Sequence, residues 1–158
     1  MKMLLKKIIS GGQTGADRAA LDAAIACGMD YGGSIPRGRN AEDGSIDRRY
    51  EKLVELDSAM HRVRTEQNVM DADATLIFTR GEATGGTALT VQYAQQYKKP
   101  FLLVDVMDTG TDEAAVGIEK WLDETRPTVL NVAGPRESKS PGMYGTVYHI
   151  LAELLLQQ

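Results

Sequence analysis

The sequence predicts an α/β protein of three layers, in which a doubly wound parallel sheet of about five strands is covered by helices on both faces. Short apolar runs alternate with segments of helical periodicity along the chain. The runs are apolar on both alternating sets of positions, as in Phe101–Val104, which is typical of strands buried on both faces. The glycine-rich segments that follow two of these runs fit the loops found at the carboxyl ends of parallel strands.

The apolar runs are the predicted strands. They are Leu4–Ser10, Asp30–Ile35, Ala74–Thr79, Phe101–Val106 and Thr128–Ala133. Alternation with helices implies right-handed crossovers between parallel strands. We expect the strand order 2-1-3-4-5, because it sets the two strands with the richest glycine loops side by side, with 3-2-1-4-5 as the alternative.

Helical spacing separates the strands. In Ala16–Cys27 the apolar residues fall on one face, and Gly28 follows as a C-terminal cap. One or two further helices are expected within Ser45–Asn68. The remaining predicted helices are Thr87–Tyr97, Glu113–Thr125 and Met143–Leu156.

Composition narrows the functional class. The 158 residues, 42% hydrophobic and 25% charged, fit one domain spanning positions 1–158. The net charge of -4 argues against nucleic acid as a partner. No apolar run approaches the roughly 18 residues of a membrane span, and the start of the sequence fits a strand better than a signal peptide. Cys27 is the single cysteine, so no disulfide can form within the chain, which suits a reducing compartment. We therefore expect a cytoplasmic protein without a membrane partner.

The loop after the first strand is the strongest candidate for binding. Glycine permits positive φ and close approach of a ligand, and the following helix offers free N–H groups and a positive dipole end. The loop is neither a P-loop nor a GxGxxG dinucleotide motif. The alternative is a tight turn that needs glycine for its geometry alone. The predicted ligand-binding residues are Gly11, Gly12, Gln13, Thr14 and Gly15.

A second glycine-rich loop follows the third strand. Gly85, Gly86 and Thr87 again precede a helix, so the same reasoning predicts an anion site. Two such helix starts facing one crevice would bind an anionic small molecule better than either one alone.

Two further loops carry charged side chains. Arg37 and Arg39 could clamp a phosphate or carboxylate, and a solvated charged loop is the alternative. Arg136 and Ser138, with Lys139, lie in a long segment after the fifth strand. Its alternative is a mobile surface loop.

Catalytic groups are not evident. Glu66 is the one weak candidate for a general base, and an exposed helix glutamate is the commoner interpretation. His61 and His149 have no partner at metal-ligand spacing, so no metal site is predicted.

These segments resemble the putative molybdenum carrier family, the circularly permuted YpsA-like branch of the SLOG superfamily. The resemblance covers nearly the whole chain, and the first of its stretches is quite specific. The matching stretches are 9–22 (ISGGQTGADRAALD), 36–44 (PRGRNAEDG), 65–69 (TEQNV), 73–75 (DAT), 85–87 (GGT) and 131–138 (NVAGPRES).

The resemblance implies a Rossmann-like fold and a ligand derived from a nucleotide, or the molybdenum cofactor, a pterin with a phosphate. Related cytokinin-activating enzymes carry a PGGxGTxxE motif with a catalytic Glu. Here Thr87 is followed by Ala88, Leu89 and Thr90, which argues against that hydrolase activity.

Two functional hypotheses remain open. The first is a carrier or sensor for a phosphate-containing nucleotide-like or pterin ligand, and the alternative is a hydrolase that cleaves an N-glycosidic or phosphate bond of a nucleotide. The alanine-rich first helix would also suit packing against a second subunit, so a homo-oligomer is a further hypothesis.

Overall fold

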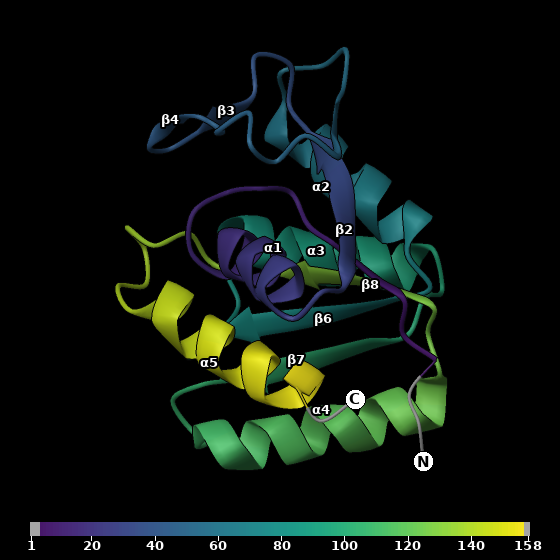
Figure 1. Ribbon diagram of the computed structural model, residues 1–158. Helices are drawn as coiled ribbons and strands as arrows, with labels where there is room; N and C mark the ends of the chain where they lie inside the picture. Colours follow the sequence, from purple (N-terminus) through teal and green to yellow (C-terminus); the bar gives the residue numbers. More distant parts are fainter. Residues whose placement is uncertain (1–3, 157–158) are drawn as a thin grey trace.

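A computed structural model describes residues 4–156 and contains a six-stranded parallel sheet (Figure 1). A separate two-stranded antiparallel hairpin is formed by β3 (Asn40–Ala41) and β4 (Gly44–Ser45). The strands of the main sheet are β1 (Lys7–Ile9), β2 (Asp30–Ile35), β5 (Leu53–Glu55), β6 (Ala74–Thr79), β7 (Phe101–Asp105) and β8 (Val129–Ala133). The helices are α1 (Ala16–Ala26), α2 (His61–Asp71), α3 (Gly85–Gln96), α4 (Thr111–Thr125) and α5 (Met143–Leu156).

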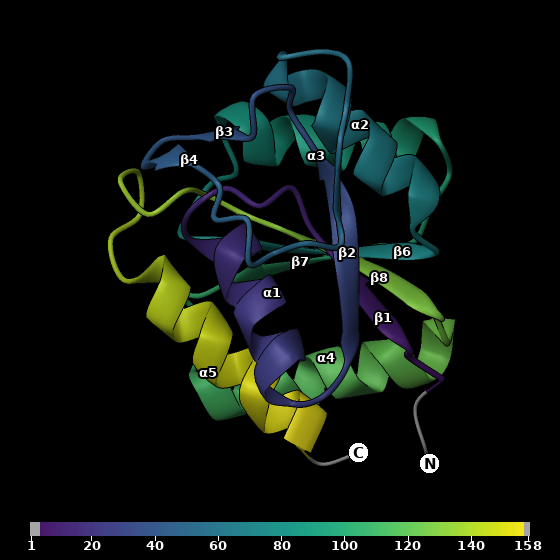
Figure 2. The ribbon, with the colours of Figure 1, turned by 45° about the horizontal axis from the view of Figure 1, so that its top comes forward.

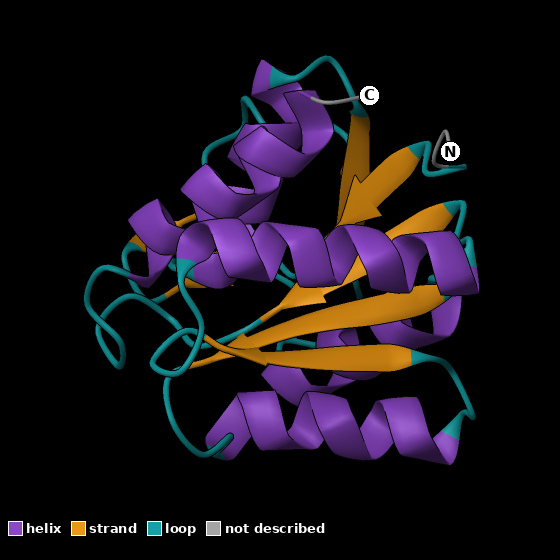
Figure 3. Cartoon of the chain, turned by 90° about the horizontal axis from the view of Figure 1, so that it is seen from below, coloured by secondary structure: helices purple, strands orange, loops and turns teal. Residues whose placement is uncertain are grey.

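The helices cover both faces of the sheet, which confirms the predicted three-layer α/β architecture (Figures 2 and 3). Helices α2 and α3 pack together on one face, while α5 packs between α1 and α4 on the other. Within residues 4–156 no helix is both long and apolar enough to cross a membrane.

The strand order is β5-β2-β1-β8-β6-β7, so both predicted orders are wrong. The last strand, β8, is inserted between β1 and β6 and pairs in parallel with both. Leu130 and Val132 of β8 are fully buried, whereas Leu103 of the edge strand β7 is 44% exposed. Both runs are equally apolar in sequence, so their composition does not reveal which one is central.

The segment Ser45–Asn68, expected to hold one or two helices, contains the first part of one helix, α2. It also contains the short edge strand β5, which was not predicted and of which only Leu53 is buried. A strand of three residues with one buried side chain has too little periodicity to be predicted.

Small residues bring α1 close to its neighbours. The alanines expected to face another subunit are buried within the chain, where α1 packs on α5. At the end of β8 a Cβ on Gly134 would lie 2.7 Å from the Cβ of Ala16. This close packing draws the carboxyl ends of β1, β8 and β6 together at one edge of the sheet.

Candidate functional site

A cleft of about 720 Å³ lies beyond the carboxyl ends of β1, β8 and β6. Its walls come from the segments after these three strands and from the first turns of α2. Several predicted residues meet there, although β8 separates the two strands expected to be adjacent. Those that line the cleft are Gln13, Gly85, Gly86, Thr87 and Arg136.

The lining of the cleft is strongly basic. Its carboxyl groups are those of Asp17 and Glu82, and burial together with Arg64 and Arg136 lowers the pKa of the lining residue His61. An imidazole with a lowered pKa is neutral at pH 7 and does not offset the excess of positive charge. The basic side chains that line the cleft are Arg62, Arg64, Arg80, Arg136 and Lys139. This arrangement favours an anionic ligand.

The glycine-rich loop after β1 is closed by its own side chains. The N–H of Gly12 donates to Ser10 Oγ (3.3 Å), and that of Gln13 donates to Asp17 Oδ2 (3.4 Å). The N–H of Thr14 donates to Gln13 Oε1 (3.0 Å). Three of the donors predicted to hold an anion therefore already have partners inside the protein.

Asp17 and Arg64 form a buried ion pair against this loop. Arg64 Nη1 lies 3.5 Å from Asp17 Oδ2, and the two side chains are 14% and 4% exposed. Burial raises the pKa of Asp17 to about 6, against the opposing effect of Arg64. The guanidinium lies so close to Gly11 that a Cβ there would clash with it. Gly11 thus makes room for the arginine.

The loop after β6 is open by contrast. The helix α3 begins after Thr84 without a side-chain cap. Within the described chain, no hydrogen bond is found for the N–H groups of Gly85 and Gly86. The Nζ of Lys139 lies 2.9 Å from the position of a Cβ on Gly85. The start of α3 therefore combines unpaired N–H groups, a positive dipole end and a lysine.

The other predicted binding residues lie outside the cleft lining. Arg39 is buried and donates to the carbonyls of Ile46 and Asp47 at 3.0 Å, so it supports the chain around β4. Arg37 is exposed. The glycines at 12 and 15 have positive φ and shape the first loop.

Thr14 and Ser138 brace the rim of the site. Both bond to the carboxylate of Glu42 in the turn between β3 and β4, Thr14 through its hydroxyl and Ser138 through its N–H. The N–H of Glu42 also donates to Gln13 Oε1 (2.9 Å). These contacts join the loops after β1 and β8, so the two residues position the cleft without lining it.

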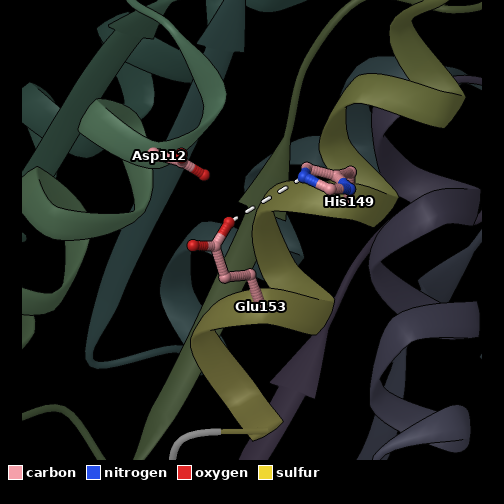
Figure 4. Close-up of side chains that lie close together, drawn as sticks. All are labelled: Asp112, His149 and Glu153. Carbon is pink, nitrogen blue, oxygen red and sulfur yellow. Dashed lines mark ion pairs between the residues drawn. The ribbon is translucent and has the colours of Figure 1, made fainter.

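Glu66, the candidate base, is not among the residues that line the cleft. Its carboxylate accepts a hydrogen bond from the Tyr97 hydroxyl (2.5 Å). His149 lies outside the cleft as well, with Glu153 one helical turn away (3.9 Å) and Asp112 of α4 nearby (Figure 4). The fold thus adds Asp112 to a pair that is already one helical turn apart in the sequence, and this cluster lies at the surface.

Three arginines of the cleft were not predicted from the sequence. Arg80 directly follows β6 and lines the cleft. Its place after a predicted strand could have indicated that it lies at the carboxyl edge of the sheet. Arg62 and Arg64 reach the cleft because α2 begins there, and no local pattern indicates where that helix sits.

Comparison with known proteins agrees with this fold. A crystal structure of a protein from Syntrophus aciditrophicus SB, described as a putative molybdenum carrier protein, superposes with a TM-score of 0.95. The two sequences are 46% identical over 99% of this chain and 98% of the other. No curated protein matches the sequence.

The family model of the circularly permutated YpsA SLOG family matches residues 8–155. This range includes the whole sheet except Lys7 of β1, and every segment of the cleft. The resemblance seen in the sequence is therefore confirmed, and the chain belongs to the circularly permutated YpsA SLOG family.

Proposed function

We propose that this protein is a carrier or sensor that binds a small oxyanion-bearing ligand, a phosphate-containing nucleotide or a pterin phosphate such as the molybdenum cofactor. One observation carries the proposal: the unpaired N–H groups that start α3 open into a cleft with five basic side chains and two carboxyl groups. Helix starts and guanidinium groups are the usual protein donors to phosphate oxygens. The similarity to a protein described as a molybdenum carrier supports a carried ligand.

The donors suit an oxyanion better than a directly ligated metal. Cys27, the single cysteine, caps the far end of α1, and His61 is the one imidazole of the described cleft lining. A molybdenum-containing cargo would therefore be held through its phosphate and oxo groups by hydrogen bonds. A cleft of about 720 Å³ falls within the range of sites for small molecules.

A thermal-shift panel tests the proposal. The probes are AMP, ADP-ribose, NAD, GTP, sodium molybdate and isolated molybdenum cofactor. A ligand at 100 times its Kd stabilises the fold by about 2.7 kcal/mol, which corresponds to a rise in Tm of roughly 5–11 °C. Arg136→Met should reduce the shift, because its side chain lines the cleft, whereas Arg48→Met, an exposed arginine elsewhere, should not. No shift with any probe would contradict the proposal.

One observation favours a second function, hydrolysis of an N-glycosidic or phosphate bond in a nucleotide. Asp17 lines the cleft, and a carboxyl group with a pKa of about 6 can exchange protons near neutral pH. Turnover of the same nucleotides, followed by chromatography, should then be lost in Asp17→Asn while binding persists. Bound but unchanged nucleotides would exclude this activity.

A further inference from the structure

The start of α3 forms one group of unsatisfied donors, which we call the α3 subsite. Ser140 lines the cleft beside Lys139, is only 5% exposed, and its Oγ is buried without a hydrogen-bond partner in the described residues. Buried hydroxyls are nearly always paired, so an unpaired one that lines a cleft is a candidate donor to a ligand. With the N–H groups of Gly85 and Gly86, the donors suit one oxyanion.

A second group of donors lies around Arg64, and we call it the Arg64 subsite. One edge of this guanidinium faces Asp17, and Nη2 lies 3.5 Å from His61 Nδ1. Its Nε is buried and lacks a partner within residues 4–156. Arg136 lies near enough to help lower the pKa of His61. A guanidinium with an unused buried donor is suited to bind an oxyanion.

The two subsites are separated by a whole strand. The Arg64 guanidinium lies over Gly11 at the end of β1, the α3 subsite follows β6, and β8 runs between them. Neighbouring strands lie about 4.8 Å apart, so the strand ends are roughly 10 Å apart. Two anionic groups on one ligand therefore match this arrangement better than a single tetrahedral oxyanion does. Five basic side chains against two carboxyl groups also exceed what one phosphate monoester neutralises.

We infer that the natural ligand is a bis-oxyanion, with one anionic group at the α3 subsite, the other at the Arg64 subsite, and a neutral body between them. This inference rests on the proposed function and makes it more specific, because it excludes ligands with a single anionic group as the natural cargo. The shared chemistry fits a nucleoside bisphosphate or a phosphorylated pterin that carries an oxometal group.

Equilibrium dialysis against sodium tungstate, with tungsten counted per chain, tests the two subsites, since tungstate is a single tetrahedral oxyanion. The wild-type protein should bind two. Arg64→Met is paired with Asp17→Asn, because removal of the arginine alone would leave a buried carboxylate, and this double variant should bind one. Gly86→Asp, which sets a carboxylate in the α3 subsite, should also bind one, and Arg48→Met should still bind two.

Displacement of the bound tungstate tests whether one ligand spans both subsites. Adenosine 3′,5′-bisphosphate should release both tungstates at one molecule per chain, and AMP should release one. A single tungstate per chain, retained in the Asp17→Asn/Arg64→Met variant, would overturn the two-subsite inference and leave the proposed function standing. Release of one tungstate by the bisphosphate would overturn the spanning ligand, and no tungstate at all would overturn both the inference and the proposed function.

Discussion

The two glycine-rich loops of this protein look alike in sequence and behave differently in the fold. Both follow a strand at the same edge of the sheet, and both precede a helix. In the loop after β1, the N–H groups of Gly12, Gln13 and Thr14 are bonded to side chains. In the loop after β6, those of Gly85 and Gly86 face the cleft unpaired in the described structure.

Glycine content therefore does not by itself identify an anion site. A glycine-rich loop can bind an anion only where its N–H groups are not already hydrogen-bonded, and this depends on the acceptors near them. The start of α5 supports this, because Glu137 accepts hydrogen bonds from the N–H groups of Gly142 and Tyr144, both at 2.8 Å. Unlike the loop after β1 and the start of α5, the start of α3 thus has no side-chain acceptor for its first N–H groups in the described part of the chain.

Alanine substitutions should separate the two loops most clearly. Gly15 has a φ of 77°, and a Cβ there would clash with the carbonyl of Pro135. We expect Gly15→Ala to lower the free energy of unfolding by about 2–5 kcal/mol, from backbone strain and overpacking together. Urea denaturation measures the change.

Gly86→Ala is the matched control. A Cβ at Gly86 meets no atom within 4 Å, and alanine is the better helix former. Its stability should therefore equal or slightly exceed that of the wild type. Equal stabilities of Gly15→Ala and the wild type would show that the first loop is not held in the rigid form described.

Asp17, which accepts a hydrogen bond from the first loop, should make the stability of the protein depend on pH. Its pKa is raised from 3.8 to about 6, so the folded protein holds this proton more tightly than the unfolded chain does. Stability should therefore fall as pH rises from about 4 through 6, by roughly 3 kcal/mol. Urea denaturation across this range should show that decline in the wild type relative to Asp17→Asn, whose amide does not titrate.

Asp43 provides the opposite control. It pairs with Arg18 at 2.9 Å, and this hydrogen bond lowers the pKa of its carboxyl group. The stabilisation it gives is present above the ordinary carboxyl pKa and is lost as pH falls. Asp43→Asn should remove the loss of stability at low pH that comes from Asp43. It should keep the fall in stability with rising pH that comes from Asp17. Parallel pH profiles for Asp17→Asn and the wild type would contradict the burial of an ionisable carboxyl at the start of α1, beside the first loop.

Gly86→Asp should have opposite effects on binding and on stability. A carboxylate in the first turn of α3 stabilises the helix by about 0.3–1 kcal/mol, but it repels an anion at the same N–H groups. We expect the affinity for AMP to fall at least about tenfold, or ~1.4 kcal/mol. Calorimetric titration measures the affinity, and unchanged AMP binding would mean that the open helix start is not the site.

Much of the fold could be predicted because its elements have strong local patterns. Asp30–Ile35 and Ala74–Thr79 coincide with β2 and β6 to the residue. The sheet order could not be predicted, since it depends on the pairing of β8 with β1 and β6, which are distant from it in sequence. The apolar pattern of a strand does not indicate which other strands pair with it.

The outline of the candidate site could also be predicted, because the glycine-rich loops have a clear local pattern. Both glycine loops reach the cleft edge, but the acceptor that closes the first loop is Asp17, and the arginine that covers it, Arg64, lies on a helix distant in sequence. Asp17 could be read as a charge favourable to a helix start. Its role as an internal acceptor becomes visible only when the buried geometry is known.

Glu42 should give the smallest effect, because it holds the first loop to the rim from an exposed position. Hydrogen bonds from Ser138 and Thr14 lower the pKa of its carboxyl group, so its stabilising contacts are lost as pH falls below the ordinary range of glutamate. Solvent screening limits the effect, and Glu42→Gln should cost less than about 1 kcal/mol at pH 7 by urea denaturation, with the difference shrinking near pH 3.5. AMP affinity should change little, since Glu42 joins the loops after β1 and β8 without lining the cleft. A large loss of affinity would instead mean that the rim contacts, and not the open start of α3, hold the cleft in its binding form.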